Sequence, residues 1–266
     1  MGLNGAEPDT GAVLKEVMRS KKYSRLYPPV IERVCREEYI KFDRDLERAK
    51  AVKKKLHSLY GAFAKDGSII KISALLDKME NGVDIKKTSA EILELHASTA
   101  ERVNNLAEFY EFIFKYINGG GILDLGCGLN PFSIPFMPEK PSSYRAFDVD
   151  TETRELIDRY FILLGLPPGC GCADLIIETP VQNADAAFLF KLAPVLESQR
   201  RGRAFELMNE LRTELIIATY PLKSLGGKNK GMERFYPEKF EGSLGSGLII
   251  EDKKIIGNEL VYIVKK

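Results

Sequence analysis

The stretch ILDLGCGLNPF, residues 122–132, decides the fold expected for this chain. Its apolar residues form a short run that carries one acid, Asp124, and that leads into the turn Gly126-Cys127-Gly128. An apolar run that ends in a glycine turn is typical of a buried parallel strand whose carboxyl end faces a ligand. Glycines in the turn let the backbone pass close to that ligand, where a Cβ atom would collide with it.

A second acid narrows the choice of ligand. Asp148 ends the next apolar run, twenty residues after Gly128, and an acid at that strand tip commonly holds ribose hydroxyls. The turn lacks the third glycine of a dinucleotide site, and Pro131 breaks the helix that would begin beneath a pyrophosphate. S-adenosylmethionine has no phosphate, and acids at 124 and 148 fit its amino-acid and ribose ends. A glycine turn without a ligand is the simpler alternative, but two strand-end acids favour this cofactor.

Strands and helices alternate from residue 122 onward, and the alternation ends in a hairpin. Apolar runs predict further strands at residues 144–148, 186–192 and 214–220, with helices between them at residues 151–164 and 194–211. The turn Gly257-Asn258 joins two apolar runs into a predicted β-hairpin, residues 248–256 and 260–265. This order favours an α/β, Rossmann-like class I S-adenosylmethionine-dependent methyltransferase with an N-terminal α-helical domain. A dinucleotide fold would instead end on another parallel crossover.

The N-terminal third is expected to be helical. Apolar residues at helical spacing predict helices at residues 12–20, 29–40, 43–60 and 69–79, and the apolar stripe of the third includes Leu46. Two capping boxes, Thr88–Glu91 and Ser98–Glu101, predict two further helix starts, and the second helix runs to about Tyr116. The predicted division is an N-terminal helical, basic RNA-binding domain at residues 1–87 and a cofactor-binding methyltransferase domain at residues 88–266.

Composition excludes several classes of protein. Hydrophobic residues make up 44% of the 266 and charged residues 29%, as in soluble globular proteins. No apolar run approaches the roughly 18 residues of a membrane span, and the N-terminus does not resemble a secretory signal. The four cysteines form neither a disulfide nor a zinc pattern. We therefore expect a cytoplasmic protein with no membrane association, no metal and reduced thiols.

Basic residues gather in two places, although the net charge is only +1. Residues 1–60 hold 14 Lys and Arg against 9 Asp and Glu. On the helix expected at 43–60, the predicted RNA-binding residues are Arg48, Lys50, Lys53, Lys54 and Lys55; a solvated helix surface explains them equally well. A later loop mixes basic and aromatic residues, which suits phosphates and an extruded base. Its predicted RNA-binding residues are Lys223, Lys228, Lys230, Met232, Arg234, Phe235 and Tyr236; a surface loop anchored by its aromatic rings is the alternative.

Several motifs together resemble one known family. They are LHASTAER (95–102), DLGCGLNPF (124–132), FKLAPVLE (190–197), SLGGKNKGME (224–233) and the C-terminal IEDKKIIGNELVYIVKK, with KKYSRLYPP (21–29) and LHSLYGAF (56–63) nearer the N-terminus. They closely resemble the aminoglycoside-resistance 16S rRNA guanine-N7 methyltransferases, the Arm/Rmt or FmrO family. The resemblance implies that the 30S subunit is the substrate, and that one guanine of its decoding-site helix is modified. It also implies resistance to 4,6-disubstituted 2-deoxystreptamines.

The resemblance also implies roles for individual residues toward S-adenosylmethionine. Arg102 is expected to hold the cofactor carboxylate, and His96, Ala97 and Ser98 to line the same pocket. Gly126, followed by Gly128, corresponds to the first cofactor motif, and Asp148 is expected to take the ribose hydroxyls. The remaining expected neighbours of the cofactor are Asp174 and Leu175 beside the adenine, then Phe190 and Gln199, and Phe63 from the N-terminal domain.

The expected chemistry requires no general base, because guanine N7 carries a lone pair and no proton. No catalytic residue is therefore predicted. Lys191, after the expected fourth strand, is either an orienting residue or part of a structural salt bridge. The chain is expected to act as a monomer. Two alternatives remain open: a small-molecule methyltransferase with a helical lid, and a non-catalytic RNA-binding protein that has kept the fold.

Overall fold

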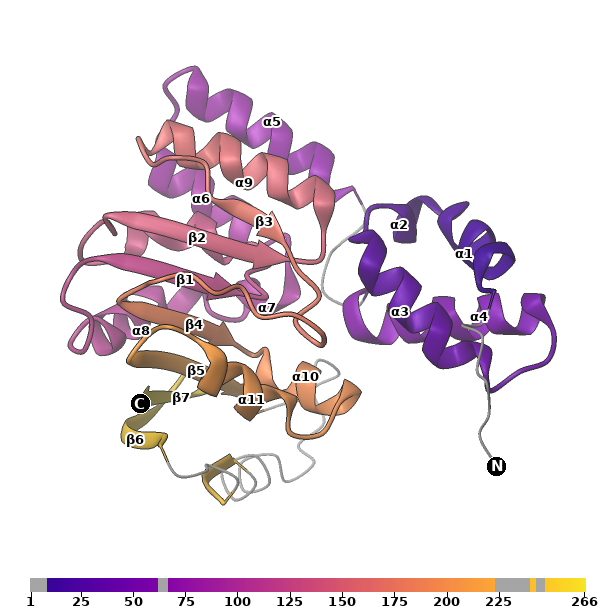
Figure 1. Ribbon diagram of the computed structural model, residues 1–266. Coiled ribbons are helices and arrows are strands. Elements are labelled where there is room, and N and C mark those ends of the chain that lie inside the picture. The colour runs from indigo at the N-terminus through magenta and orange to yellow at the C-terminus, as the bar shows by residue number, and fades with distance from the viewer. Residues whose placement is uncertain (1–8, 62–66, 223–239, 243–246) are drawn as a thin grey trace.

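The computed structural model describes residues 9–61, 67–222, 240–242 and 247–266. Within these residues, seven strands form one sheet in the order β3-β2-β1-β4-β5-β7-β6 (Figure 1). Their bounds are β1 Gly121–Leu125, β2 Ser143–Asp148, β3 Cys170–Cys172, β4 Ala186–Phe190, β5 Leu215–Pro221, β6 Ile249–Ile256 and β7 Glu259–Lys265. The predicted α/β fold is confirmed, and so is the hairpin at its end.

The predicted central strand, β1, lies in the middle of the five parallel strands, β3-β2-β1-β4-β5. All five residues of β1 are buried, and β1 pairs in parallel with β2 and with β4, so that Leu123 lies opposite Arg145 and Ala187. By contrast, β7 is inserted antiparallel between β5 and β6, with Thr219 opposite Val261. The carboxyl ends of the parallel strands therefore meet at one edge, where ligands of open α/β sheets bind.

Helices cover both faces of the sheet. On one face lie α5 Ser68–Glu80, α6 Ile85–Leu93, α8 Leu106–Ile113 and α9 Thr151–Leu163, and on the other lie α10 Ala193–Gln199 and α11 Arg203–Glu210 (Figure 1). Successive residues of β1 point to opposite faces: Ile122 belongs to the first core and Leu123 to the second. Asp150 caps α9, because its carboxylate accepts hydrogen bonds from the backbone N–H groups of Glu152 and Thr153.

The first four helices form a separate group with its own core. They are α1 Gly11–Met18, α2 Lys21–Ser24, α3 Pro28–Tyr39 and α4 Asp45–Leu56, and they lie beyond the carboxyl ends of the parallel strands (Figure 1). A π-helical turn, His57–Gly61, continues α4. The next helix, α5, packs instead in the core of the sheet through Ile72 and Leu76. This packing favours a domain boundary between α4 and α5, earlier than residue 87.

Both helix starts predicted from capping boxes differ in the structure. Helix α6 begins at Ile85, since Asp84 caps it by accepting from the Lys87 N–H, and the Thr88 hydroxyl donates back to the Asp84 carbonyl. The single helix predicted from Ser98 to Tyr116 is interrupted. It consists of α7 Ala97–Ala100, a 3₁₀ turn at Val103–Asn105 and α8. The interruption coincides with Arg102, whose buried side chain is held by Glu259.

Two smaller expectations are also corrected. The helix predicted at 194–211 is split into α10 and α11, because Gly202 adopts φ +86° and caps α11. In α4, Leu46 is 63% exposed and does not belong to the apolar stripe. It lies in the first turn, where the N-terminal core does not reach.

Candidate active site

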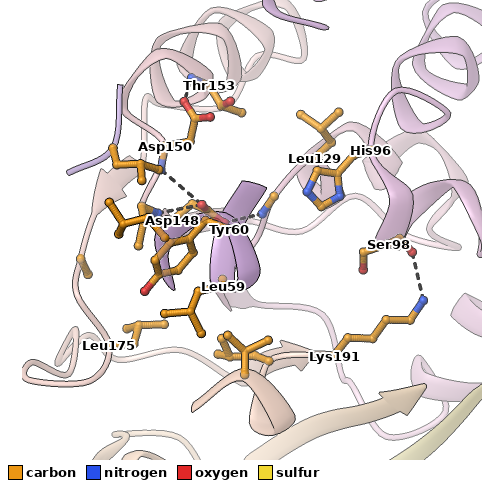
Figure 2. Close-up of a pocket in the computed structure, with 18 of the residues that line it drawn as sticks. Leu59, Tyr60, His96, Ser98, Leu129, Asp148, Asp150, Thr153, Leu175 and Lys191 are labelled. Carbon is orange, nitrogen blue, oxygen red and sulfur yellow. Dashed lines mark hydrogen bonds between the residues drawn. The ribbon is translucent and has the colours of Figure 1, made fainter. Parts of the chain in front are cut away.

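A cavity opens at the carboxyl ends of β1, β2 and β4 (Figure 2). Both domains line it. From the sheet domain come the glycine turn and the segments that follow the strands, and from the N-terminal helices come apolar and aromatic side chains. Of the predicted cofactor-binding residues, those that line the cavity are His96, Ser98, Gly126, Gly128, Asp148, Asp174, Leu175, Phe190 and Gln199. Ala97 and Arg102 do not line it, and Phe63 lies outside the described residues.

The glycine turn forms a narrow cradle. Gly126 and Gly128 have φ of +63° and +50°, a conformation that other residues adopt with strain. A Cβ atom added at Gly126 would lie 2.7 Å from a methyl of Leu192, and one at Gly128 would lie 3.0 Å from the ring of His96. A side chain at either position would therefore have to displace a residue that lines the cavity. This geometry supports the reading of the turn as a cofactor motif.

Asp148 is held in place by the turn itself. One carboxylate oxygen accepts from the Gly128 N–H at 2.7 Å, and the other accepts from the Val149 N–H at 2.7 Å (Figure 2). Burial raises the pKa of Asp148, although these N–H groups oppose the shift. The side chain lines the cavity and presents a fixed acceptor, which is what vicinal ribose hydroxyls require.

Asp124 has a different role from the one predicted. It is 1% exposed and does not line the cavity. One of its oxygens accepts from the Asn130 amide at 2.9 Å and from the Tyr144 hydroxyl at 2.7 Å. Burial raises the pKa of Asp124 to about 7. Asp124 therefore holds the loop after β1 through Asn130 and Tyr144, and it lies outside the residues that line the cavity.

A cluster of buried charges lies beside the cavity. Arg102 donates to both oxygens of Glu259, from Nε at 3.1 Å and from Nη2 at 2.9 Å, and its Nη1 donates to Asn130 at 3.0 Å. Lys191 Nζ pairs with Glu259 at 3.0 Å and with Glu101 at 2.5 Å. Burial alone would raise the pKa of Glu259, but Arg102 and Lys191 lower it. Arg102 is thus turned toward Glu259 and not toward the cavity.

Lys191 has an unusual backbone as well as two acidic partners. Its φ is +56°, the only positive φ at a non-glycine residue among those described. The strain is balanced locally, because the Lys191 N–H donates to Thr219 and its Nζ also donates to the Ser98 carbonyl at 3.2 Å (Figure 2). The structure therefore includes the predicted salt bridge, and it also places the side chain on the cavity wall.

His96 lies across the cavity from Lys191. Burial, followed by the positive charges of Lys191 and Arg25, lowers the pKa of His96 to about 4. The imidazole is therefore neutral at physiological pH. A neutral ring against the glycine turn suits a cationic ligand such as a sulfonium, because it adds no positive charge to the cavity.

The N-terminal helices contribute residues that the sequence did not identify. Tyr23, Leu26, Leu56, Leu59 and Tyr60 line the cavity. The contact is also made through the backbone at the rim of the site. The Tyr27 N–H donates to the Val149 carbonyl at 2.7 Å, and the Thr151 N–H donates to the Arg25 carbonyl at 2.9 Å. Closure of the site thus depends on the N-terminal domain.

Arg33 of α3 is a further residue that sequence analysis missed. Its guanidinium donates to Asp174 at 2.6 and 3.2 Å and to Gln199 at 3.0 Å. The sequence contained a signal, because Arg33 follows Val30 and Ile31 on the apolar side of its helix. In the structure Arg33 is only 5% exposed. A charged residue at a buried helical position requires a partner.

The predicted RNA-binding residues on α4 differ among themselves. Arg48 donates to the carbonyls of Tyr39 and Phe42 and stacks on the Tyr39 ring. Lys53 pairs with Glu16 at 3.0 Å, and Lys55 pairs with Glu37 at 2.6 Å. Two of these lysines, Lys50 and Lys54, are exposed and form no ion pair with the residues that the structure describes. The residues predicted in the later loop, Lys223, Lys228, Lys230, Met232, Arg234, Phe235 and Tyr236, lie outside the described residues.

Among the described residues, no group of His, Cys, Asp and Glu could hold a metal ion. Nor does any helix in the described ranges have the length and apolar character needed to cross a membrane.

Comparison with known proteins agrees with this architecture over nearly the whole chain. Residues 19–263 match the family model described as ribosomal RNA methyltransferase (FmrO). A 16S rRNA (guanine(1405)-N(7))-methyltransferase of Serratia marcescens is 34% identical over 95% of this chain and 97% of its own length. The enzyme of the same name from Micromonospora echinospora is 31% identical over 100% of both chains.

Solved structures give the same result. The crystal structure of the 16S rRNA methyltransferase RmtF in complex with S-adenosyl-L-homocysteine matches with a TM-score of 0.90 and 32% identity, over 98% of this chain and 100% of that one. The 16S rRNA methylase RmtB matches with a TM-score of 0.84 and 29% identity, over 97% and 98% of the two chains. Fold, site and relatives agree, and this chain belongs to the FmrO family of ribosomal RNA methyltransferases.

Proposed function

We propose that this protein transfers the methyl group of S-adenosylmethionine to N7 of one guanine in the decoding-site helix of 16S rRNA, within the 30S subunit. The observation that carries the proposal is the cavity beside the glycine turn and Asp148, in a chain that matches ribosomal RNA methyltransferases over residues 19–263. The names of its relatives support the base and the atom. Such a reaction takes place in the cytoplasm, where the subunits are.

The residues of the cavity fit this cofactor. Asp148 supplies acceptors for the ribose, the cradle at Gly126 and Gly128 admits a ligand close to the backbone, and Asp174 with Leu175 forms a polar and apolar wall for the adenine. The predicted role of Arg102 would require exchange of partners, because a cofactor carboxylate would have to replace Glu259.

The chemistry places few demands on the protein. S-adenosylmethionine supplies a methyl carbon bonded to a positively charged sulfur. The N7 lone pair forms the new bond, and the electrons of the carbon–sulfur bond remain on sulfur, so no proton is moved. The chain contributes in-line placement of the two reactants and exclusion of water. Lys191, fixed between Glu101 and Glu259, is suited to orient the base or the cofactor.

Among the predicted RNA-binding residues of α4, we propose RNA contact chiefly for Lys50 and Lys54. Lys50 and Lys54 are exposed, and neither forms an ion pair within the described part of the chain. The contribution of Lys223, Lys228, Lys230, Met232, Arg234, Phe235 and Tyr236 stays a prediction.

Methylation of N7 adds a fixed positive charge and removes a hydrogen-bond acceptor. Both changes oppose binding of a polycationic aminoglycoside at that guanine, so resistance to 4,6-disubstituted 2-deoxystreptamines is expected.

The test is methyl transfer from labelled S-adenosylmethionine to purified, unmodified 30S subunits, with the product mapped by strand scission at N7-methylguanine. A single modified guanine in the decoding helix is expected. Labelling of an adenine would contradict the target, and absence of labelling despite cofactor binding would favour a small-molecule substrate.

A variant pair makes the same experiment specific for the site. Asp148→Asn is expected to reduce transfer by about 10-fold or more, because the charged acceptor for the ribose is lost. Asp185→Asn is the matched control, since Asp185 accepts from the Gly121 N–H at the amino end of β1, away from the cavity. Equal losses in both variants would argue against Asp148 as a cofactor ligand.

A further inference from the structure

Arg33 joins the N-terminal domain to the wall of the cofactor cavity. It projects from α3, and its side chain is 6% exposed. The Nε donates to one oxygen of Asp174 at 2.6 Å, and Nη2 donates to the other at 3.2 Å. The Nη2 also donates to Gln199 at 3.0 Å, and Nη1 donates to Glu37 at 2.7 Å. One guanidinium thus holds two residues that line the cavity.

The contact is built for a fixed geometry. A bidentate pair between a guanidinium and a carboxylate sets the orientation of both groups, which a lysine cannot do. Burial alone would lower the pKa of Arg33, but the hydrogen bonds and charge of Asp174 raise it, so the side chain stays cationic. Glu37 is in turn held by Lys55 at 2.6 Å, so the support of Arg33 extends into α4.

The carboxylate of Asp174 keeps limited capacity toward the cavity. Its two oxygens offer about four acceptor positions. Arg33 Nε and Nη2 take two of these, and the Ile176 N–H takes a third at 3.2 Å. Because Asp174 also lines the cavity, one acceptor position remains for a donor that enters there.

We propose that Arg33 is a positioning residue for the adenine of the cofactor: it holds the Asp174 side chain in a fixed orientation, so that the remaining acceptor takes the exocyclic amino group. The inference rests on the proposed function for the identity of the cofactor. It adds a dependence of base recognition on the N-terminal domain, because Arg33 and its supporting residues belong to α3 and α4.

The test uses the difference between an amino group and a carbonyl on the same ligand. S-adenosylhomocysteine carries the amino group, and S-inosylhomocysteine carries an oxygen in its place. Binding of both to the full chain is measured by titration calorimetry. The parent protein is expected to prefer the amino form by roughly 10- to 100-fold. Arg33→Lys is expected to reduce that preference to less than about threefold, since the carboxylate loses its fixed orientation.

Arg203 provides the matched control. It is also a buried arginine, 2% exposed, and its Nε donates to the Leu175 carbonyl at 2.6 Å, on the same segment as Asp174. It does not line the cavity. Arg203→Lys is expected to lower stability but to keep the preference for the amino form. An Arg33→Lys protein that binds both ligands more weakly by the same factor would overturn the proposal, because that result indicates a structural role alone.

A second variant covers the case in which Arg33→Lys does not fold. Arg33→Met combined with Asp174→Asn removes both charges and leaves none unpaired. It is expected to bind the two ligands equally, and a retained preference would overturn the proposal. The assay is also separate from RNA methylation. If the parent protein binds neither ligand, the proposed function fails; if it binds both without preference, only the inference about Arg33 and Asp174 fails.

Discussion

The charged side chains beside the cavity are buried, whereas the charged side chains on α4 are partly exposed to solvent. Arg102, Lys191 and Glu259 are less than 10% exposed as side chains and hold each other at fixed geometry. On α4, Lys53 pairs with Glu16, but both side chains are about one-third exposed. Removing one partner from the first group leaves a charge without water, whereas the second group is solvated in any case. Loss of an ion pair is therefore expected to lower stability more beside the cavity than on α4.

The largest effect is expected at Glu259. Glu259→Gln leaves both Arg102 and Lys191 without their shared counter-ion, and it should lower the free energy of unfolding by about 3–5 kcal/mol. Urea unfolding followed by circular dichroism measures this loss. Glu251→Gln is the control, because Glu251 pairs with Lys265 on the exposed hairpin surface. A loss under about 1 kcal/mol at Glu259 would remove the contrast between the two regions.

Asp124 sharpens the comparison, because it is buried and forms no ion pair among the residues that the structure describes. The folded pKa is raised to about 7 from 3.8, so the folded state keeps a proton that the unfolded state loses. Stability should then fall as pH rises through this window. Asp124→Asn should abolish that slope and gain about 2–4 kcal/mol relative to the parent between pH 4 and 7.

The measurement for Asp124 is urea unfolding of parent and variant at several pH values. His96 has a lowered pKa, which gives the opposite slope below pH 6.5, but it does so in both proteins and cancels in the difference. Parallel stability curves for the two proteins would show that Asp124 is ionised in the folded state at low pH, contrary to the expectation.

A smaller effect is expected at the solvated lysines. Replacing Lys50 and Lys54 with Gln should leave stability within about 0.5 kcal/mol. It should weaken binding to 30S subunits and lower the slope of log affinity against log salt by about 1–2. Filter binding over a salt series measures both quantities. If the slope is unchanged, the exposed face of α4 does not contact RNA.

The smallest effect on RNA binding is expected at Lys53. Lys53→Gln removes its pair with Glu16, and the loss of stability should be under about 1 kcal/mol. Its effect on the salt slope should be smaller than that of Lys50 and Lys54 together, because its charge is already balanced within the domain. An equal effect on the salt slope would mean that pairing with Glu16 does not decide which lysines reach RNA.

The sheet could be predicted from sequence because its signals are local. The apolar run at 122–125 and the turn Gly257-Asn258 mark β1 and the hairpin without reference to the rest of the chain. The first residues of helices could be predicted less reliably. Asp84 competes with the capping box that begins at Thr88, and only the folded structure shows that Asp84 is the N-cap.

Pairing between distant residues could not be predicted in the same way. Arg33 and Asp174 are 141 residues apart in sequence, and Arg102 and Glu259 are 157 apart. Spacing identified Asp148, since its position at a strand end fixes where it lies. It did not identify the partner of Arg102, because nothing in the local sequence brings β7 to the interrupted helix. The residues of the cavity were thus more predictable than the contacts that hold them.

The position of Glu259 on β7 also sets an order of events during synthesis. The ribosome makes Arg102 and Lys191 long before Glu259, and β7 must enter between β5 and β6 before its carboxylate reaches them. Until then the nascent sheet domain lacks the carboxylate that Arg102 and Lys191 share, and one edge of β5 is open. The domain can therefore fix Arg102 and Lys191 beside the cavity only after the strand at 259–265 has emerged, late in translation.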